Sequence, residues 1–168
     1  MTLRLTPRKL PYAFKVAADA QAVGPARRLV REIVESLDLG KQAPSLDDLE
    51  LLTAELITNA VVHTRAPCVV CIRWTGRRIR VEVTDTDTRD VEATVPPPGD
   101  EHGRGLFLVD VLAAAWGSHR EPAGKTTWFE LAADSEDPLP SGAALPSAGC
   151  HDRQMTRGAV KVRTHGGP

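Results

Sequence analysis

Two hydrophobic periods divide residues 12–132 of the chain into short strands and amphipathic helices. Alternating apolar and polar positions are typical of strands, and apolar positions at helical spacing are typical of helices. The strand patterns and the turn signals around them predict strands over residues 12–16, 69–74, 78–84 and 126–131. Helical spacing predicts helices over about 23–37, 46–63 and 105–115.

The ends of these elements carry ordinary start and stop signals. Asp19 can cap the first helix, and Gly40 stops it. Ser45, with Asp48 three residues on, opens the second helix in the manner of a capping box. Thr75-Gly76-Arg77 is a hairpin signal, so the two central strands are expected to be adjacent and antiparallel.

The order of elements shows no dominant alternation of strand, helix and parallel strand. It therefore predicts an α+β fold, a two-layer α/β sandwich whose mixed, mostly antiparallel sheet has helices on one face. The domain is expected to cover residues 12–132, which hold all the aromatic residues. Residues 1–11 form an N-terminal extension. Residues 133–168 are predicted to be a flexible tail, because their first half is rich in Ala, Pro, Ser and Gly.

Composition and charge exclude several classes of protein. The chain has 21 Lys and Arg against 22 Asp and Glu, and a net charge of −1 argues against direct binding to nucleic acid. No apolar run approaches the roughly 18 residues of a membrane span, and no secretory signal is recognisable. The three cysteines are an odd number, and Cys68 and Cys71 are expected on opposite faces of a strand as buried thiols. We therefore expect a soluble cytoplasmic protein.

The second helix carries a polar row beside its apolar stripe. Glu55, Asn59 and His63 lie at i, i+4 and i+8 and therefore one above another. Glu55 could accept a proton from water or a hydroxyl, and the Asn59 amide oxygen suits Mg²⁺. The alternative is an ordinary half-exposed polar edge, which is common on amphipathic helices.

Three further segments could contact a ligand. Asp85 ends a strand, where its carboxylate could accept from an amino group such as that of adenine. Gly103-Arg104-Gly105 opens a helix, whose free N–H groups favour phosphate. Thr126 begins the last strand and could hydrogen-bond a neighbour of Asp85. Each has a plain alternative, as a turn residue, a helix entry or a strand entry.

In their order along the chain, these segments resemble the boxes of the histidine-kinase-like ATPase superfamily (the Bergerat fold), over about residues 12–132. The N box, G1 box, G2 box and last box correspond to Glu55-Leu-Ile-Thr-Asn59-Ala60-Val-Val-His63, Asp85, Gly103-Arg104-Gly105-Leu106 and Thr126. The small size, Ala115-Trp116-Gly117 and the Trp-Phe-Glu-Leu ending are most similar to bacterial anti-sigma regulatory factors of the serine/threonine protein kinase type.

This resemblance implies an ATP and Mg²⁺ site with one role for each matched residue. Glu55 would be the general base, Asn59 the Mg²⁺ ligand and Asp85 the adenine contact. Gly103, Arg104 and Gly105 would hold the phosphates, and the rest of the nucleotide site would be His63, Leu106 and Thr126. Such proteins bind a sigma factor and phosphorylate a Ser or Thr of an antagonist protein, usually as homodimers.

Two functions remain open at this point. An ATP-dependent protein kinase is favoured by the Glu55–Asn59 pair. A sequestering module without catalysis is favoured by Asp87, because the G1 box usually has glycine there and a second carboxylate repels Asp85. A sensor histidine kinase is not expected, because no transmembrane segment, sensor domain or phosphoacceptor helix precedes the domain.

Overall fold

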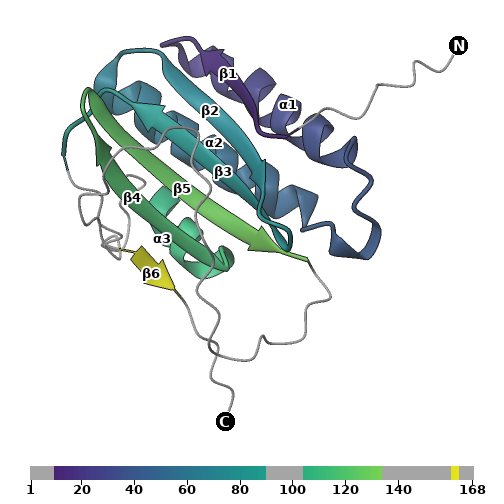
Figure 1. The fold of residues 1–168 in the computed structure, drawn as a ribbon. Coiled ribbons are helices and arrows are strands. Elements are labelled where there is room, and N and C mark those ends of the chain that lie inside the picture. The colour runs from purple at the N-terminus through teal and green to yellow at the C-terminus, as the bar shows by residue number, and fades with distance from the viewer. Residues whose placement is uncertain (1–9, 90–103, 134–159, 163–168) are drawn as a thin grey trace, which may run out of the picture.

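The structure, a computed structural model, describes residues 10–89 and 104–133 and the backbone of residues 160–162. It is a two-layer α+β sandwich (Figure 1). Along the chain, the strands are β1 (Tyr12–Val16), β2 (Cys68–Trp74), β3 (Arg78–Asp85), β4 (Ala115–Glu121), β5 (Gly124–Ala132) and β6 (Val160–Val162). The helices are α1 (Val23–Glu35), α2 (Leu46–Thr64) and α3 (Arg104–Leu112), with short 3-10 turns at Ala20–Ala22 and Gly40–Gln42.

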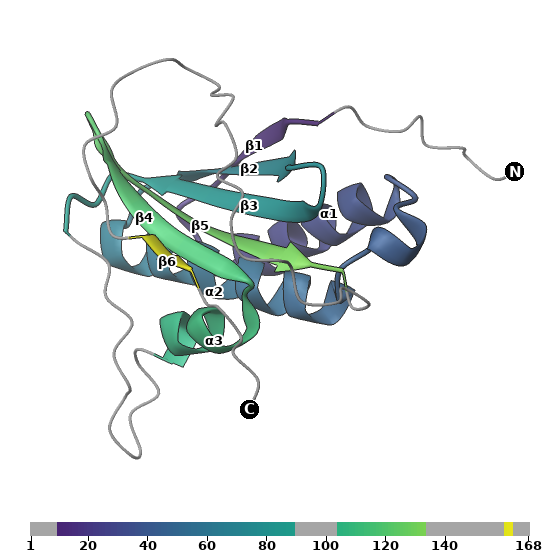
Figure 2. The same ribbon diagram turned by 60° about the horizontal axis from the view of Figure 1, so that its bottom comes forward.

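The six strands form one sheet in the order β1-β2-β3-β5-β4-β6, and every neighbouring pair is antiparallel. All three helices lie against one face of this sheet (Figure 2). No helix of the described residues covers the other face. The predicted fold class is therefore confirmed, and the mixed sheet that was expected is antiparallel at every described pair.

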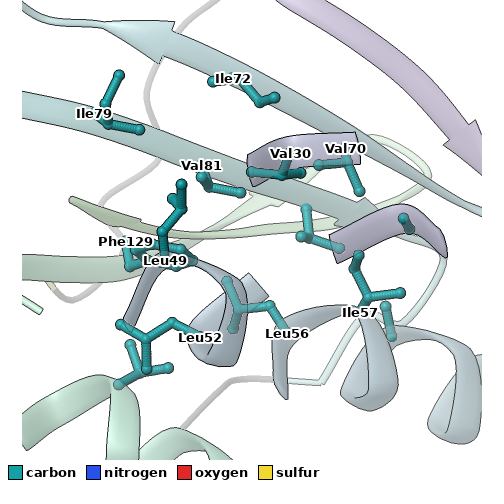
Figure 3. Close-up of a cluster of buried hydrophobic side chains, with 14 of the residues drawn as sticks. Val30, Leu49, Leu52, Leu56, Ile57, Val70, Ile72, Ile79, Val81 and Phe129 are labelled. Atoms are coloured by element: carbon teal, nitrogen blue, oxygen red, sulfur yellow. The ribbon is translucent and has the colours of Figure 1, made fainter. Parts of the chain in front are cut away.

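The core lies between the central strands and α2, with α1 beside it (Figure 3). Alternation along the strands turns every second side chain toward the helices. The helices meet them with apolar positions at helical spacing. The fully buried members that Figure 3 labels are Val30, Leu49, Leu52, Ile57, Val70, Ile72, Ile79, Val81 and Phe129.

The predicted cap of α2 is confirmed, but the predicted end signals of α1 are wrong: α1 ends at Glu35, and Gly40 begins a 3-10 turn instead of stopping the helix. The Ser45 hydroxyl accepts from the backbone N–H of Asp48 at 3.2 Å, which caps α2. Asp19 caps the 3-10 turn that leads into α1 rather than α1 itself. Cys68 is buried on the helix face of β2, while Cys71 lies on the opposite face, as the strand period requires.

The sequence did not predict β4. The sequence predicted a helix to about residue 115 and nothing between it and the last strand, but α3 ends at Leu112 and β4 follows. The run of alanines at 113–115 favours a helix, and β4 is poor in β-branched residues. Pairing with β5 overrides this local preference, and the backbone N–H of Ala114 already donates to the Glu130 carbonyl at 2.9 Å.

The sheet also takes in a part of the predicted tail. Residues 160–162 form β6, which pairs with Ala115–Gly117 at the free edge of β4. The pattern of the sequence indicated no element there. The domain boundary near residue 132 otherwise stays a prediction.

Candidate functional site

A pocket of about 210 Å³ opens on the helix side of the sheet, where β3 and β5 face α2 and α3. Because both apolar and charged side chains line it, it can hold a ligand that is part apolar and part polar. Its lining residues are Leu56, Asn59, His63, Val83, Asp85, Asp87, Arg89, Leu106, Lys125 and Thr127. The structure therefore brings together four of the site residues predicted from sequence, which are Asn59, His63, Asp85 and Leu106.

Asp85 is the most buried acidic residue of this pocket. The alternation along β3 puts it on the same face as Val81 and Val83, so its carboxylate points to the helix side with 5% of the side chain exposed. Its Oδ1 accepts from the backbone N–H of Asp87 at 2.7 Å. Burial raises the pKa of Asp85 above its usual value, and the N–H of Asp87 and the charge of Lys125 oppose that rise.

A close approach of two strands fixes the position of Asp85. Gly124 begins β5 beside the end of β3, and a Cβ there would collide with the Asp85 carbonyl oxygen. Glycine is therefore needed for Lys125 to pair directly with Asp85 in the sheet.

Asp87 does not stand in the pocket as an uncompensated charge. Its Oδ2 lies 2.9 Å from the Lys125 ammonium and 2.9 Å from the Arg89 guanidinium. The hydrogen bonds from Arg89, together with those from Lys125, hold the pKa of Asp87 well below its usual range. The repulsion expected between Asp85 and Asp87 is thus offset by two cations.

The polar row of α2 divides between two places. Asn59 and His63 line the pocket beside Leu56. Glu55, one turn earlier, is not among the lining residues and packs instead against the first turn of α3. A Cβ on Gly105 would lie 2.5 Å from the Glu55 Oε2, so a larger residue there would force this carboxylate to shift.

Burial raises the pKa of Glu55 above its usual value. A carboxylate with a raised pKa binds a proton more strongly and is better suited to act as a base near neutral pH. The contact between Glu55 and Gly105 therefore joins the N-box and G2-box segments at the start of α3.

The threonine predicted for the site needs a correction. Thr126 lies on the face of the sheet away from the helices, where its Oγ1 is 2.7 Å from the Oγ1 of Thr84. It does hydrogen-bond a neighbour of Asp85, as predicted, but it does not line the pocket. Thr127 does, because the strand period turns it to the same side as Phe129.

Two of the predicted phosphate contacts cannot be placed. Gly103 and the Arg104 side chain lie outside the described residues. Their assignment stays a prediction, as does that of Gly105, which the structure places at the start of α3.

Sequence reasoning missed three polar lining residues: Lys125, Thr127 and Arg89. The period of the last strand carried a signal for the first two, since positions 125, 127 and 129 fall on one face. The predicted strand began at Thr126, which left Lys125 outside it, and the site assignment was given to Thr126 instead of Thr127. Nothing in the sequence marked Arg89.

The residues present fit a Mg²⁺ ion that is shared with a ligand. Among the described residues, no group of three His, Cys, Asp or Glu could hold a metal alone. Mg²⁺ commonly takes one or two protein oxygens together with phosphate oxygens and water. The Asn59 amide in the pocket carries an oxygen of this kind, and the phosphates of a nucleotide would supply the rest.

Comparison with known families identifies the class. The family model of the histidine kinase-like ATPase domain matches residues 16–131, which is well over half of the 168 residues. The chain belongs to this family. Among curated proteins, no relative matches it. None of the helices in the described part of the chain has the length and hydropathy needed to cross a membrane.

Proposed function

We propose that the protein is an ATP-dependent anti-sigma factor that phosphorylates a Ser or Thr of an antagonist protein. One observation carries the nucleotide part: Asn59 and Asp85, from separate boxes of the sequence, line a single pocket. The family match to a histidine kinase-like ATPase domain supports the same ligand class.

Separate residues of the pocket suit separate parts of Mg·ATP. The buried Asp85 carboxylate can accept a hydrogen bond from the exocyclic amine of adenine. Asn59 would ligate Mg²⁺, which neutralises the charge that develops on the phosphates during transfer. The free N–H groups at the start of α3 favour a phosphate there.

Glu55 is the proposed general base. It would take the proton from the Ser or Thr hydroxyl of the partner as the hydroxyl oxygen forms its bond to the γ-phosphorus of ATP, and ADP would leave with the electrons of the broken P–O bond. Its raised pKa and its place against Gly105 support this role.

The proposed partners come from the resemblance to anti-sigma regulatory factors. The protein would bind a sigma factor and release it when the unphosphorylated antagonist competes, and phosphorylation of the antagonist would restore the sigma-bound state. A homodimer is the proposed form.

Capture from a cell extract, with and without Mg·ATP, tests the partner part of this proposal. We expect an RNA polymerase sigma factor and a second small protein among the captured chains. That second protein, once purified, should receive label from γ-³²P-ATP on a Ser or Thr in the presence of the wild-type protein. Label on histidine, or capture of neither partner, would contradict the proposal.

One observation favours a sequestering module without catalysis. Asp87, Lys125 and Arg89 place three charged side chains in the pocket, where the family usually has a glycine at the position of Asp87. If the wild-type protein captures a sigma factor but transfers no label to any partner, this second function holds.

A further inference from the structure

Lys125 lies in the nucleotide pocket between two carboxylates. Its Nζ is 2.9 Å from Oδ2 of Asp87 and 3.6 Å from Oδ1 of Asp85. Only 11% of the Lys125 side chain is exposed, so its charge is little screened by water.

The fold holds this lysine in place from two directions. Its backbone pairs directly with Asp85, and directly opposed residues of antiparallel strands point to the same face. Its ammonium is anchored at the other end by Asp87, whose carboxylate accepts four hydrogen bonds of 2.9–3.2 Å from Arg89. Lys125 therefore has one position rather than many.

We propose that Lys125 is a positioning residue for nucleotide binding: anchored by Asp87, its ammonium keeps the Asp85 carboxylate ionised and oriented as a hydrogen-bond acceptor. This inference rests on the proposed nucleotide site. It also gives a role to Asp87, which stands where the family usually has glycine. A carboxylate as buried as that of Asp85 would otherwise tend to take up a proton.

Other charged or titratable groups face this cluster from each neighbouring element. His63 lines the pocket from α2. Cys68, on β2, is near enough to Asp85 to be affected by its charge. Burial, together with the charge of Asp85, raises the pKa of Cys68 to about 11, so this thiol stays neutral at the pH values of interest. Arg120 lies directly opposite Lys125 in the backbone register of β4 and β5.

The sign of the expected pH dependence follows. Only the ionised Asp85 carboxylate is a pure acceptor, so nucleotide affinity falls as the pH drops through the pKa of Asp85. Loss of the Lys125 charge removes an influence that lowers this pKa, and the fall in affinity moves to higher pH. Asp87→Asn removes a negative charge that raises this pKa but keeps a side-chain oxygen that can accept from the Lys125 ammonium. The anchor therefore stays, and the fall moves to lower pH.

The test is the Mg·ATP affinity of the full chain, measured by calorimetry between pH 5 and pH 9. For Lys125→Met we expect the midpoint of the acid-side fall to rise by about 1 pH unit or more, the usual effect of an opposite charge at this distance. For Asp87→Asn we expect a shift in the opposite direction. Lys125→Arg keeps the charge and should restore the wild-type midpoint.

The matched control is Arg120→Met, which removes a cation from the neighbouring strand at the position directly beside Lys125. It should leave the midpoint unchanged, because Arg120 is exposed and water screens its charge, whereas Lys125 is buried. Shifts of the same sign in Lys125→Met and Asp87→Asn, or no shift in Lys125→Met, would overturn the proposal, because a structural role alone gives no opposed pair of shifts.

A second measurement separates this inference from the proposed function. The titration of the Asp85 carboxyl carbon, followed by ¹³C NMR without nucleotide, should move upward in pH in Lys125→Met. If the wild-type protein binds no nucleotide, the proposed function fails, and the NMR titration still decides whether Lys125 holds Asp85 ionised. If nucleotide binds and the NMR titration does not move, the inference about Lys125 alone is wrong.

Discussion

At the scale of single residues, the pocket joins side chains that the sequence predicted for a ligand site with charged contacts that it did not predict. Asn59 and Asp85 were predicted from helix spacing and from the end of a strand, and they line one pocket. The pairing of Asp87 with Lys125 was not predicted, because it joins residues on different strands. A pattern along the chain fixes which face a side chain takes but not which charge it meets there.

Glu55 and Asn59 should have separable roles, although they lie on one helix. Glu55→Ala is expected to spare ATP binding and to lower phosphoryl transfer by about 10²–10⁴-fold, since a base acts only in the transition state. Asn59→Ala is expected to weaken Mg²⁺-dependent binding and transfer together. Single-turnover label transfer beside equilibrium binding measures both.

The contact with Gly105 supplies the control for this prediction. Gly105→Ala forces the Glu55 carboxylate to move, so it should lower transfer as well. The double variant with Glu55→Ala should then lose no more than Glu55→Ala alone, because both changes act through one group. A Glu55→Ala variant that cannot bind ATP would show that Glu55 is structural or linked to the metal.

At the scale of elements, periodicity predicted α2 and the two central strands and failed at β4. The failure has a physical reason, since β4 is held by its pairing with β5 and by little that is local to it. The same long-range pairing decides which threonine faces the ligand. Thr127 and Lys125 reach the pocket because the period of β5 turns them to the same face as Phe129.

The start of β5 should be sensitive to a single methyl group. Gly124→Ala places a Cβ against the Asp85 carbonyl oxygen, so it should lower the free energy of unfolding by about 1–3 kcal/mol. Urea unfolding followed by circular dichroism measures the change.

Gly24→Ala in α1 is the matched control, since the nearest atom to a Cβ there is the Nη1 of Arg28 at 3.6 Å. Alanine favours a helix over glycine by about 0.5–1 kcal/mol, whereas Pro25 crowds the Cβ of a helical residue before it. This variant should therefore change the free energy of unfolding by less than about 1 kcal/mol in either direction. Equal effects of the two changes would show that the approach of β5 to β3 is not tight.

At the scale of the whole molecule, the sequence indicated one sandwich with a tail after residue 132. The sandwich is confirmed, and the sheet gains a short edge strand, β6, from within that tail. No hydrophobic pattern predicted β6, because an edge strand of three residues needs few apolar side chains.

Removal of residues 134–168 should change the melting temperature by no more than a few degrees. Among the described residues, the core lies between β1–β5 and the helices, so the truncation removes the pairing of β6 with β4 and no core residue. A change of a few degrees corresponds to about 1 kcal/mol for a domain of this size. Thermal unfolding of the full chain and of the truncated chain makes the comparison. A larger fall would show that the segment after Ala133 packs on the domain.

The identity of the ligand is the central claim at this scale, and it depends on Asp85. Adenine carries an exocyclic amine that a buried carboxylate can bind, whereas hypoxanthine has none and guanine carries its amine on another carbon. Calorimetric titration of the wild-type chain with Mg·ATP, Mg·GTP and Mg·ITP tests the claim most directly. ATP should bind more tightly than the other two, and Asp85→Asn should cost about 1.5–3 kcal/mol of that affinity. Equal binding of ATP and GTP, or no effect of Asp85→Asn, would contradict the assignment of this pocket to adenine.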